Sequence, residues 1–427
     1  MKKISAFSLA VIFCGISIFL QVAPISTASH YTNLFHISTT ELAKYTSLFF
    51  LTYALLQIPV GLLLDRFGVR LLLPIGLFIT LISTIFHWFA SDPTVLGFAR
   101  LFTGIGCSVA YVSAVFIASN LFKRQYIALC IALVEIVSTV GAILAGNFLT
   151  NSDQFYGWNA VNLISISFIF IIFILVVKFI FFEKELFKKS YESHNISFLK
   201  NIIDCLSLLK NKLVVSILIY CFLTWLIIMT FAGFWIKSYF IKTHGFSVNQ
   251  SLWLSQIYWF SFLFVSLFIG NYAKNIKSCS RTLVVLSIMN TVSLLYFIMP
   301  WLSTYPVLCM IFILSGAATS GVVVALSMLV FLVPKEIKGS AIALANTFIV
   351  LGAYLGQVLF GYFSSDKRII DLSLVLHPQM LTDYSAIFLF PIAAGVSFLI
   401  AIYLYFKQKT MIKIPDSQHS CDISIFM

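Results

Sequence analysis

Long apolar stretches, separated by short polar breaks, run through almost the whole chain. A helix needs about 20 mainly apolar residues to cross a bilayer, and at about 35 residues per crossing and turn the chain has room for roughly a dozen crossings. The composition, 60% hydrophobic and only 10% charged, excludes a soluble domain. The predicted crossings are residues 5–27, 45–64, 71–90, 95–121, 126–150, 158–181, 213–240, 251–270, 282–302, 306–333, 339–362 and 385–406. The sequence therefore predicts an all-α membrane protein with twelve transmembrane helices.

Two of these crossings carry start signals. Ser38 and Glu41 have the spacing of a capping box ahead of the second crossing. Asp92 followed by Pro93 is typical of the first residues of a helix and precedes the fourth crossing. We expect the second and fourth helices to begin at these residues.

Most lysine and arginine residues fall in the breaks on the side of the two termini. By the positive-inside rule, both termini are then cytoplasmic, and we expect a bacterial inner membrane. The net charge of +12 follows from this topology and predicts no nucleic-acid partner. The first 29 residues also resemble a secretory signal peptide, but the stretch is longer than a typical apolar signal core, which favours a first crossing.

The chain divides near its middle. Residues 182–212 form the longest polar stretch and are predicted to be a cytoplasmic linker between a six-helix bundle at 1–181 and another at 213–406, with a cytoplasmic tail at 407–427. An internal match supports duplication, because residues 131–142 align without gaps on the segment 211 positions later (342 minus 131). The match pairs the fifth crossing with the eleventh, as parallel repeats require.

The break after the second crossing reads Gly61-Leu-Leu-Leu-Asp65-Arg66-Phe-Gly68-Val-Arg70. This pattern resembles the signature loop between the second and third crossings of the major facilitator superfamily, a family of secondary transporters. Its glycines allow close helix approach and a sharp turn, and its charges can hold neighbouring helix ends. We expect these five numbered residues to take part in gating, with Asp65 paired to a helix N-terminus or a cation of the opposite half.

A second pattern, Arg100-Leu-Phe-Thr-Gly104-Ile-Gly106, is similar to the R-x-x-x-G-x-G pattern that the family has in its fourth crossing. The resemblance implies two pseudo-symmetric six-helix bundles that alternately expose one central site. It also implies that the first, fourth, seventh and tenth crossings line the cavity.

Two ionisable residues lie within crossings. Glu135, which aligns on the neutral Asn346 in the repeat, is about 15 Å along its helix from Gln125 and hence near the bilayer midplane. A carboxylate there costs several kcal/mol unless it is paired, hydrated or protonated, so Glu135 is the predicted proton-coupling group. Arg100 is the predicted ligand for an anionic substrate group. The alternative is a structural Arg100–Glu135 ion pair.

Other polar and aromatic side chains in crossings are candidates for substrate binding, although such residues also serve as hydrogen bonds between helices. These candidates are Gln21, Tyr53, Gln57, Trp225 and Gln256.

The predicted function is proton-coupled uptake of a small polar organic solute, such as an amino acid, a short peptide or an organic acid, by a monomer in the lipid bilayer. No proline occurs between Pro93 and Pro300, so the fifth crossing lacks the Gly-Pro pair of the family's drug exporters. The alternatives are a proton-driven exporter of a drug or siderophore, and a non-transporting sensor with the same fold. No catalytic constellation or metal-ligand spacing is visible, so we expect neither an enzyme nor a cofactor.

Overall fold

Helices form all the regular structure in the described part of the chain. The protein is represented by a computed structural model that describes residues 2–122, 127–182, 203, 206–269, 275–297, 304–333, 338–364 and 387–411, with no β-strand among them. The helices of the first half are α1 (Lys2–Val22), α2 (Pro24–Phe35), α3 (Thr39–Phe67), α4 (Val69–Trp88), α5 (Pro93–Leu121), α6 (Ile127–Ile143), the π-helix η2 (Leu144–Phe148), α7 (Leu149–Tyr156), α8 (Trp158–Val176) and the π-helix η3 (Val177–Phe181). Those of the second half are η5 (Leu208–Lys210), α11 (Lys212–Ile227), the π-helix η6 (Ile228–Trp235), α12 (Ile236–His244), α13 (Val248–Ile269), α14 (Ile276–Leu294), η7 (Leu295–Phe297), α15 (Tyr305–Thr319), α16 (Gly321–Leu332), α17 (Lys338–Ser364) and α19 (Leu389–Met411).

Within the described residues, 11 helical segments are long and apolar enough to cross a membrane. A shorter apolar helix at Leu133–Gly146 falls in the fifth predicted crossing. These segments confirm the predicted all-α, multi-pass fold. Most of the predicted linker, at 183–202, 204 and 205, and the predicted tail beyond Met411 lie outside the described residues.

Both predicted helix starts are confirmed. The Ser38 hydroxyl oxygen accepts a hydrogen bond from the Glu41 main-chain N–H at 3.1 Å, and α3 begins at the next residue, Thr39. The Asp92 carboxylate accepts hydrogen bonds from the main-chain N–H groups of Thr94 and Val95, and α5 begins at Pro93.

The turn after the second crossing is shorter than the signature pattern suggests. Helix α3 continues to Phe67, and Gly68 alone links it to α4. Gly68 has φ 73° and ψ 165°, a backbone conformation that essentially only glycine adopts. We expected another helix to pack closely against Gly61, and this expectation is wrong. A Cβ atom added at Gly61 would meet no other atom within 4 Å.

Three of the described crossings are interrupted, unlike the continuous ranges read from the sequence. The first breaks at Pro24, which lacks an N–H group to continue the helix. The fifth breaks at Gly146, whose φ and ψ of −83° and −116° are not helical. The tenth passes from α15 to α16 at Ser320. The sixth and seventh stay helical but contain the π-helices η3 and η6. Apolar periodicity marks the length of a crossing but not these interruptions.

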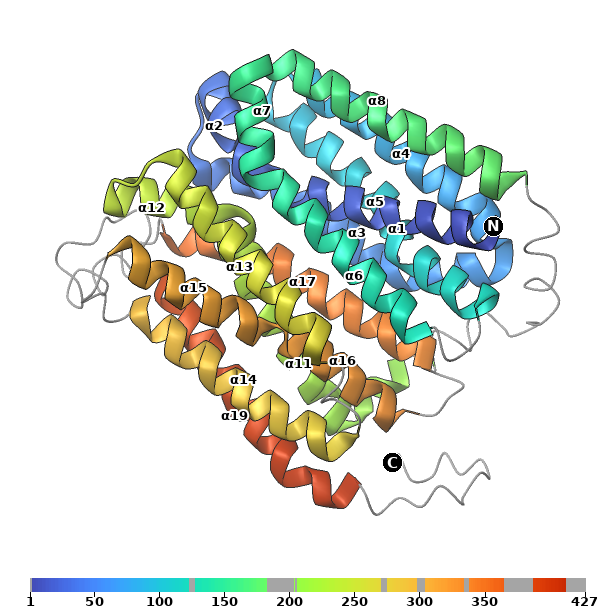
Figure 1. Cartoon of the computed structure of the whole chain (residues 1–427), viewed down its shortest axis with the longest axis vertical. Helices are drawn as coiled ribbons and strands as arrows, with labels where there is room; N and C mark the ends of the chain where they lie inside the picture. Colours follow the sequence, from blue (N-terminus) through green and yellow to red (C-terminus); the bar gives the residue numbers. More distant parts are fainter. Residues whose placement is uncertain are drawn as a thin grey trace.

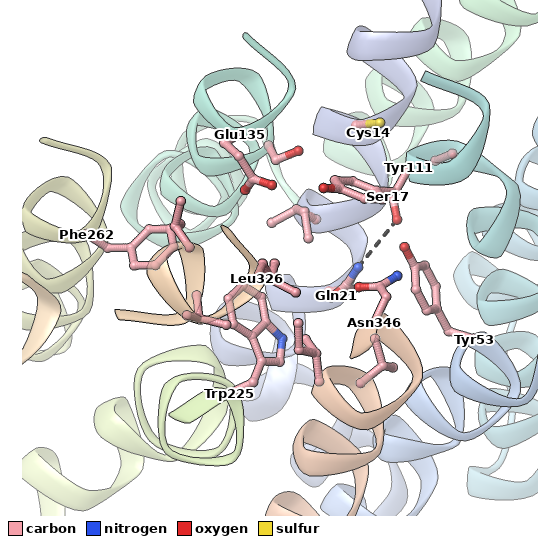
Figure 2. Close-up of a pocket in the computed structure, with 17 residues that line it drawn as sticks. Cys14, Ser17, Gln21, Tyr53, Tyr111, Glu135, Trp225, Phe262, Leu326 and Asn346 are labelled. Carbon is pink, nitrogen blue, oxygen red and sulfur yellow. Dashed lines mark hydrogen bonds between the residues drawn. The ribbon is translucent and has the colours of Figure 1, made fainter. Parts of the chain in front are cut away.

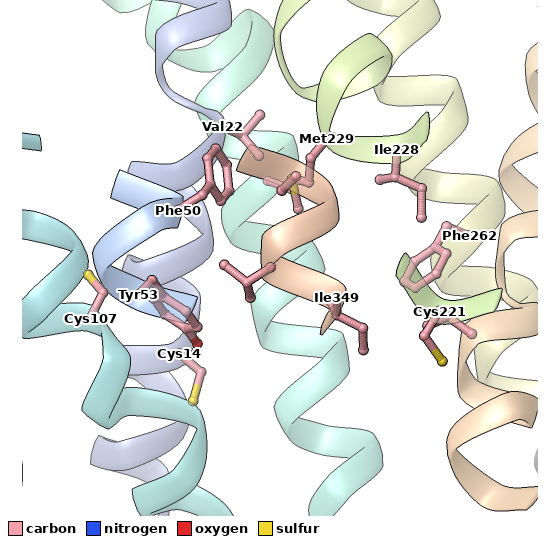
Figure 3. Packing of buried hydrophobic residues seen from close by; sticks show 14 of the residues in the cluster. Cys14, Val22, Phe50, Tyr53, Cys107, Cys221, Ile228, Met229, Phe262 and Ile349 are labelled. Atoms are coloured by element: carbon pink, nitrogen blue, oxygen red, sulfur yellow. The ribbon is translucent and has the colours of Figure 1, made fainter. Parts of the chain in front are cut away.

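The two halves lie side by side (Figure 1), with α1 to α8 on one side and α11 to α19 on the other. Contacts between the halves are made by α3 with α17 and by α6 with α13. A core of buried apolar side chains extends through both halves. Figure 3 shows part of it, with Val22 and Phe50 from the first half and Ile228 and Met229 from the second.

Equivalent glycines of the internal repeat pack in the same way in each half. A Cβ atom at Gly141 of α6 would collide with the main-chain oxygen of Gly15 in α1. At Gly352 of α17 it would collide with the main-chain oxygen of Phe222 in α11. The absence of a side chain therefore lets the fifth crossing lie against the first, and the eleventh against the seventh, at close range.

Candidate functional site

A central cavity lies between the two halves (Figure 2). The first, fourth, seventh and tenth crossings contribute to it, as the family resemblance implies, through α1, α5, α11 and α16. The second, fifth, eighth and eleventh contribute as well, through α3, α6, α13 and α17. From the first half the lining residues are Cys14, Ser17, Ile18, Gln21, Tyr53, Ala110, Tyr111, Glu135 and Ser138. From the second half they are Trp225, Phe262, Val322, Val323, Leu326, Asn346, Ile349 and Val350.

One face of α1 supplies a polar stripe to this cavity. Cys14, Ser17 and Gln21 are spaced three and four residues apart, so they project from the same side of the helix. The Gln21 side-chain amide donates a hydrogen bond to the Ser17 hydroxyl oxygen at 3.4 Å. Gln21, a predicted substrate contact, therefore lines the cavity.

Glu135 also lines the cavity, from the middle of α6. Its side chain is half-buried, and the Tyr111 hydroxyl group on α5 lies within hydrogen-bonding reach of its carboxyl group. Glu135 is the one charged side chain among the described residues that line the cavity. The carboxyl group therefore lies where it can meet both a solute and a proton.

Asn346 is the counterpart of Glu135 in the internal repeat, and both residues line the same cavity. The Asn346 side-chain amide donates a hydrogen bond to the Gln57 side-chain oxygen at 2.6 Å. Gln57 in turn donates to the main-chain oxygen of Ser108 at 3.3 Å. Gln57 is fully buried behind the lining, so its observed contact joins the two halves.

Trp225 and Phe262 form an aromatic corner on the side of the second half (Figure 2). Their ring centroids are 6.2 Å apart and the ring planes meet at 72°. Tyr53 lies on the opposite side of the cavity, close to Asn346 in Figure 2. Trp225 and Tyr53, both predicted from the sequence, therefore line the cavity from different halves.

Arg100 is buried, but it is not among the residues that line the cavity. Its guanidinium group donates hydrogen bonds to the main-chain oxygens of Leu20 at 2.7 Å and Thr46 at 3.1 Å. The same group lies 4.8 Å from the centre of the Phe49 ring. These contacts join α5 to α1 and α3, and no contact between Arg100 and Glu135 is seen among the described residues.

Gln256 lies beyond the cavity, toward the end of the bundle away from Lys2 and Met411. Its side-chain amide donates a hydrogen bond to the main-chain oxygen of Ile143 at 3.2 Å, next to the break in the fifth crossing. At the same level the Ser26 hydroxyl donates to the main-chain oxygen of Gly146, and the Lys237 ammonium group donates to the main-chain oxygen of Ser26. These contacts join the broken crossings and hold the halves together on that side.

The predicted gating residues lie at the opposite end of the bundle. The Arg70 guanidinium donates two hydrogen bonds, at 2.7 and 3.1 Å, to the main-chain oxygen of Phe181, the last residue of η3. The exposed Arg66 guanidinium lies 5.2 Å from the centre of the Phe67 ring. The side chain of Asp65 lies outside the described residues. Arg70 therefore ties the signature turn to the end of the sixth crossing.

Comparison with known proteins agrees with this architecture. Residues 6–357 match the sequence profile of the Major Facilitator Superfamily. The chain belongs to this family. The family assignment supports a membrane transporter.

Two relatives are proteins of Bacillus subtilis (strain 168). The chain is 32% identical over 159 residues to the uncharacterized MFS-type transporter YwoD, a match that covers 36% of this chain and 34% of YwoD. It is 36% identical over 80 residues to the uncharacterized transporter YybO, covering 19% of this chain and 18% of YybO. The chain therefore matches about a third or less of the length of each relative.

Several lining residues of this superfamily member were not among the predicted site residues. Tyr111 lies eleven positions after Arg100, which is about three helical turns, so the two residues project from nearly the same face of α5. This spacing could have identified Tyr111 as a candidate. Asn346 was marked by its alignment with Glu135. Cys14 and Ser17 share the face of Gln21. Phe262, in contrast, is one of 44 phenylalanines, so its sequence context does not separate it from lipid-facing residues.

Proposed function

We propose that the chain is a proton-coupled transporter of a small organic solute, with Glu135 as the group that binds the proton. The observation that carries this proposal is the position of Glu135 on the wall of the central cavity, beside Tyr111. A carboxyl group at this depth is stable when protonated or paired, and either state can be exchanged as the cavity opens to one side and then the other.

Alternating access is supported by the contacts on the side opposite the termini. Gln256 with Ile143 and Lys237 with Ser26 hold the two halves together there. Each contact is a hydrogen bond to a main-chain oxygen, worth about 0.5–1.5 kcal/mol for a neutral donor and about 1.5–3 kcal/mol for a charged donor such as Lys237. We propose that they separate when the cavity opens to that side, and that the termini face the cytoplasm of a bacterium across its inner membrane. The protein is proposed to work as a monomer.

The signature turn is proposed to act as the gate on the side of the termini. Its Arg70 contact with Phe181 anchors one flank of the turn, and Asp65 is proposed to pair with a helix N-terminus or a cation of the opposite half. Asp65→Asn is then expected to shift the population toward the state open to the cytoplasm by about 1–2 kcal/mol. Labelling of introduced cysteines from that side would increase. Unchanged labelling together with wild-type transport would remove Asp65 from the gate.

The direction of transport has two candidates. Uptake of a small polar solute is favoured by the missing Gly-Pro pair in the fifth crossing. Export in exchange for protons is favoured by the cavity, because Arg100, the predicted ligand for an anionic substrate, does not line it. Two of the three guanidinium nitrogens of Arg100 donate to the main-chain oxygens of Leu20 and Thr46. A cavity whose charge is a single carboxyl group fits an anionic solute less well than a neutral or cationic one.

The proposal is tested with purified protein in proteoliposomes. A thermal-shift screen of metabolites first identifies a ligand, since a ligand of the folded state raises its apparent stability. Accumulation of that ligand is then measured under an imposed pH gradient. Glu135→Gln is expected to abolish gradient-driven accumulation while exchange of labelled for unlabelled ligand continues, because the amide cannot release a proton. Glu41→Gln, at the exposed start of α3, is the control. Full accumulation by the Glu135 variant would refute the proposed proton site.

The same proteoliposome assay distinguishes a non-transporting sensor from a transporter. Ligand that stabilises the protein but never crosses the vesicle membrane, in either direction and with either sign of the gradient, would favour the sensor.

A further inference from the structure

The cavity has a mainly polar wall from the first half and a mainly apolar wall from the second half. The first half contributes polar groups, among them Gln21, Tyr111 and Glu135. The second half contributes Trp225, Phe262 and aliphatic side chains, with Asn346 as the polar exception. Figure 2 shows Glu135 on the opposite side of the cavity from Trp225. A solute that complements both walls has one polar end and an apolar body.

Glu135 determines the preferred charge of the polar end. Lysine and arginine are absent from the described residues that line the cavity with it. A carboxylate in surroundings of low polarity is stabilised most by a cationic partner that also donates hydrogen bonds. An ammonium group supplies both, and the neutral oxygens of Gln21 and Tyr111 can accept its remaining N–H groups.

The aromatic corner suits the rest of such a molecule. Trp225 and Phe262 present rings inclined at 72° to each other, so an apolar body can contact the face of one ring and the edge of the other. Ring faces also attract organic cations.

We infer that the substrate is a small amphipathic organic cation, with a protonated amine at Glu135 and an apolar or aromatic body against Trp225 and Phe262. The inference rests on the proposed function, because it takes the cavity to be the transport site.

This substrate class selects between the two directions of transport. One carboxyl group cannot hold a proton and an ammonium group at the same time. A proton that binds from one side therefore releases the amine, and an amine that binds from the other side releases the proton. Substrate and proton are exchanged, which is the export candidate.

Binding is tested with four probes added to the purified full-length protein. They are 2-phenylethylammonium, its neutral analogue 2-phenylethanol, the anion 3-phenylpropanoate, and ethylammonium, which lacks the ring. Dissociation constants are measured by titration calorimetry. We expect 2-phenylethylammonium to bind about tenfold to a hundredfold more tightly than 2-phenylethanol, the range for hydrogen bonds to charged groups, and 3-phenylpropanoate to bind most weakly of the aromatic probes.

Variants show how much each wall of the cavity contributes to the binding affinity for the probes. Glu135→Gln is expected to remove the preference for the amine over the alcohol while leaving the affinity for the alcohol unchanged. Phe262→Leu, which keeps an apolar side chain, is expected to weaken all three aromatic probes but not ethylammonium. Phe264→Leu is the matched control on the same helix, because Phe264 is 65% exposed on the outer surface. Tightest binding by 3-phenylpropanoate, an amine preference that survives Glu135→Gln, or no binding by any probe would overturn the inference.

Flux measurements separate this inference from the proposed function. The probe is 2-phenylethylammonium, the amine of the binding tests, and protein-free vesicles measure how much of its neutral base crosses the lipid. After this correction, its addition outside acid-loaded proteoliposomes is expected to release protons from the lumen with wild-type protein and not with Glu135→Gln. Amine binding without proton movement would refute the proposed coupling and leave the substrate class standing. Proton-coupled flux of 3-phenylpropanoate alone would refute the substrate class and leave the proposed coupling standing.

Discussion

The guanidinium group of Arg100 donates a hydrogen bond to the main-chain oxygen of Leu20, 2.7 Å away. In a continuous helix this oxygen would accept from the N–H group of the residue four positions later, which here is Pro24. Arg100 therefore supplies the donor that the proline removes, at the point where the first crossing breaks. The residue read as a substrate ligand has a structural contact in this conformation.

Arg100→Lys is expected to destabilise the protein by about 1–3 kcal/mol, because a single ammonium group cannot reach the Leu20 and Thr46 oxygens as the planar guanidinium does, and a buried acceptor is left unpaired. Thermal unfolding of the detergent-purified variant measures this loss, with Arg281→Lys on the exposed face of α14 as control. A variant of unchanged stability that loses affinity for its ligand would restore Arg100 as a substrate contact.

Pro24→Ala tests the same relationship from the other side. Alanine restores an N–H group that can donate to the Leu20 oxygen, so the combined loss of stability in Arg100→Lys with Pro24→Ala is expected to be smaller than the sum of the single losses. Additive losses would show that the proline and the arginine act independently.

Gly141→Ala and Gly352→Ala are each expected to destabilise the protein by about 1–3 kcal/mol through overpacking, because the added methyl group meets the main-chain oxygen of Gly15 or Phe222. Gly395→Ala is the matched control within a helix, since a Cβ atom there meets nothing within 4 Å. It is expected to raise stability, by about 0.5–1 kcal/mol. Thermal unfolding that showed equal effects for all three would contradict the close packing of the repeat.

Arg70→Ala is expected to speed amide hydrogen exchange in the last turn of η3, because Phe181 loses two hydrogen bonds to its main-chain oxygen. The effect on overall stability should be small, since this contact is exposed. Arg66→Ala, in which the neighbouring cation is removed, serves as the comparison. Exchange at Phe181 that is the same in both variants would mean that the Arg70 contact does not hold the sixth crossing.

Asp92→Ala is expected to lower the melting temperature at neutral pH by removing the cap of α5. Hydrogen bonds from the main-chain N–H groups of Val95 and Thr94 lower the pKa of the Asp92 carboxyl group below its ordinary value of 3.8. The stability that the carboxylate contributes is therefore complete above that ordinary pKa, and it is lost as the pH falls through the lower pKa of the folded protein. Asp92→Asn, which keeps an acceptor, should retain much of the cap.

Thermal scans at a series of pH values check the sign of this effect. The difference between wild type and Asp92→Asn is expected to shrink as the solution becomes acidic. A difference that grows in acid would contradict the assignment of the charged carboxylate as the cap.

The amino-acid sequence by itself determined the membrane class, the crossings, the helix starts at Ser38 and Asp92, and the family. Each depends on local properties: about 20 apolar residues suffice to predict a crossing, and a cap involves residues two or three positions apart. It also placed Glu135 at the depth of the cavity and paired it with Asn346. Both residues line the cavity between the halves, one from each half.

Only the tertiary structure decided which intramembrane polar groups face the cavity. Arg100 and Glu135 look alike as buried charges in the sequence, yet Arg100 reaches the oxygen that Pro24 leaves unpaired, and Glu135 lines the cavity. Gln57 and Gln256 likewise contact partners in the opposite half, at Asn346 and Ile143. These assignments depend on contacts between residues about 80 to 290 positions apart in the chain, where burial and hydrogen-bond geometry decide the partner and local sequence carries no record of it.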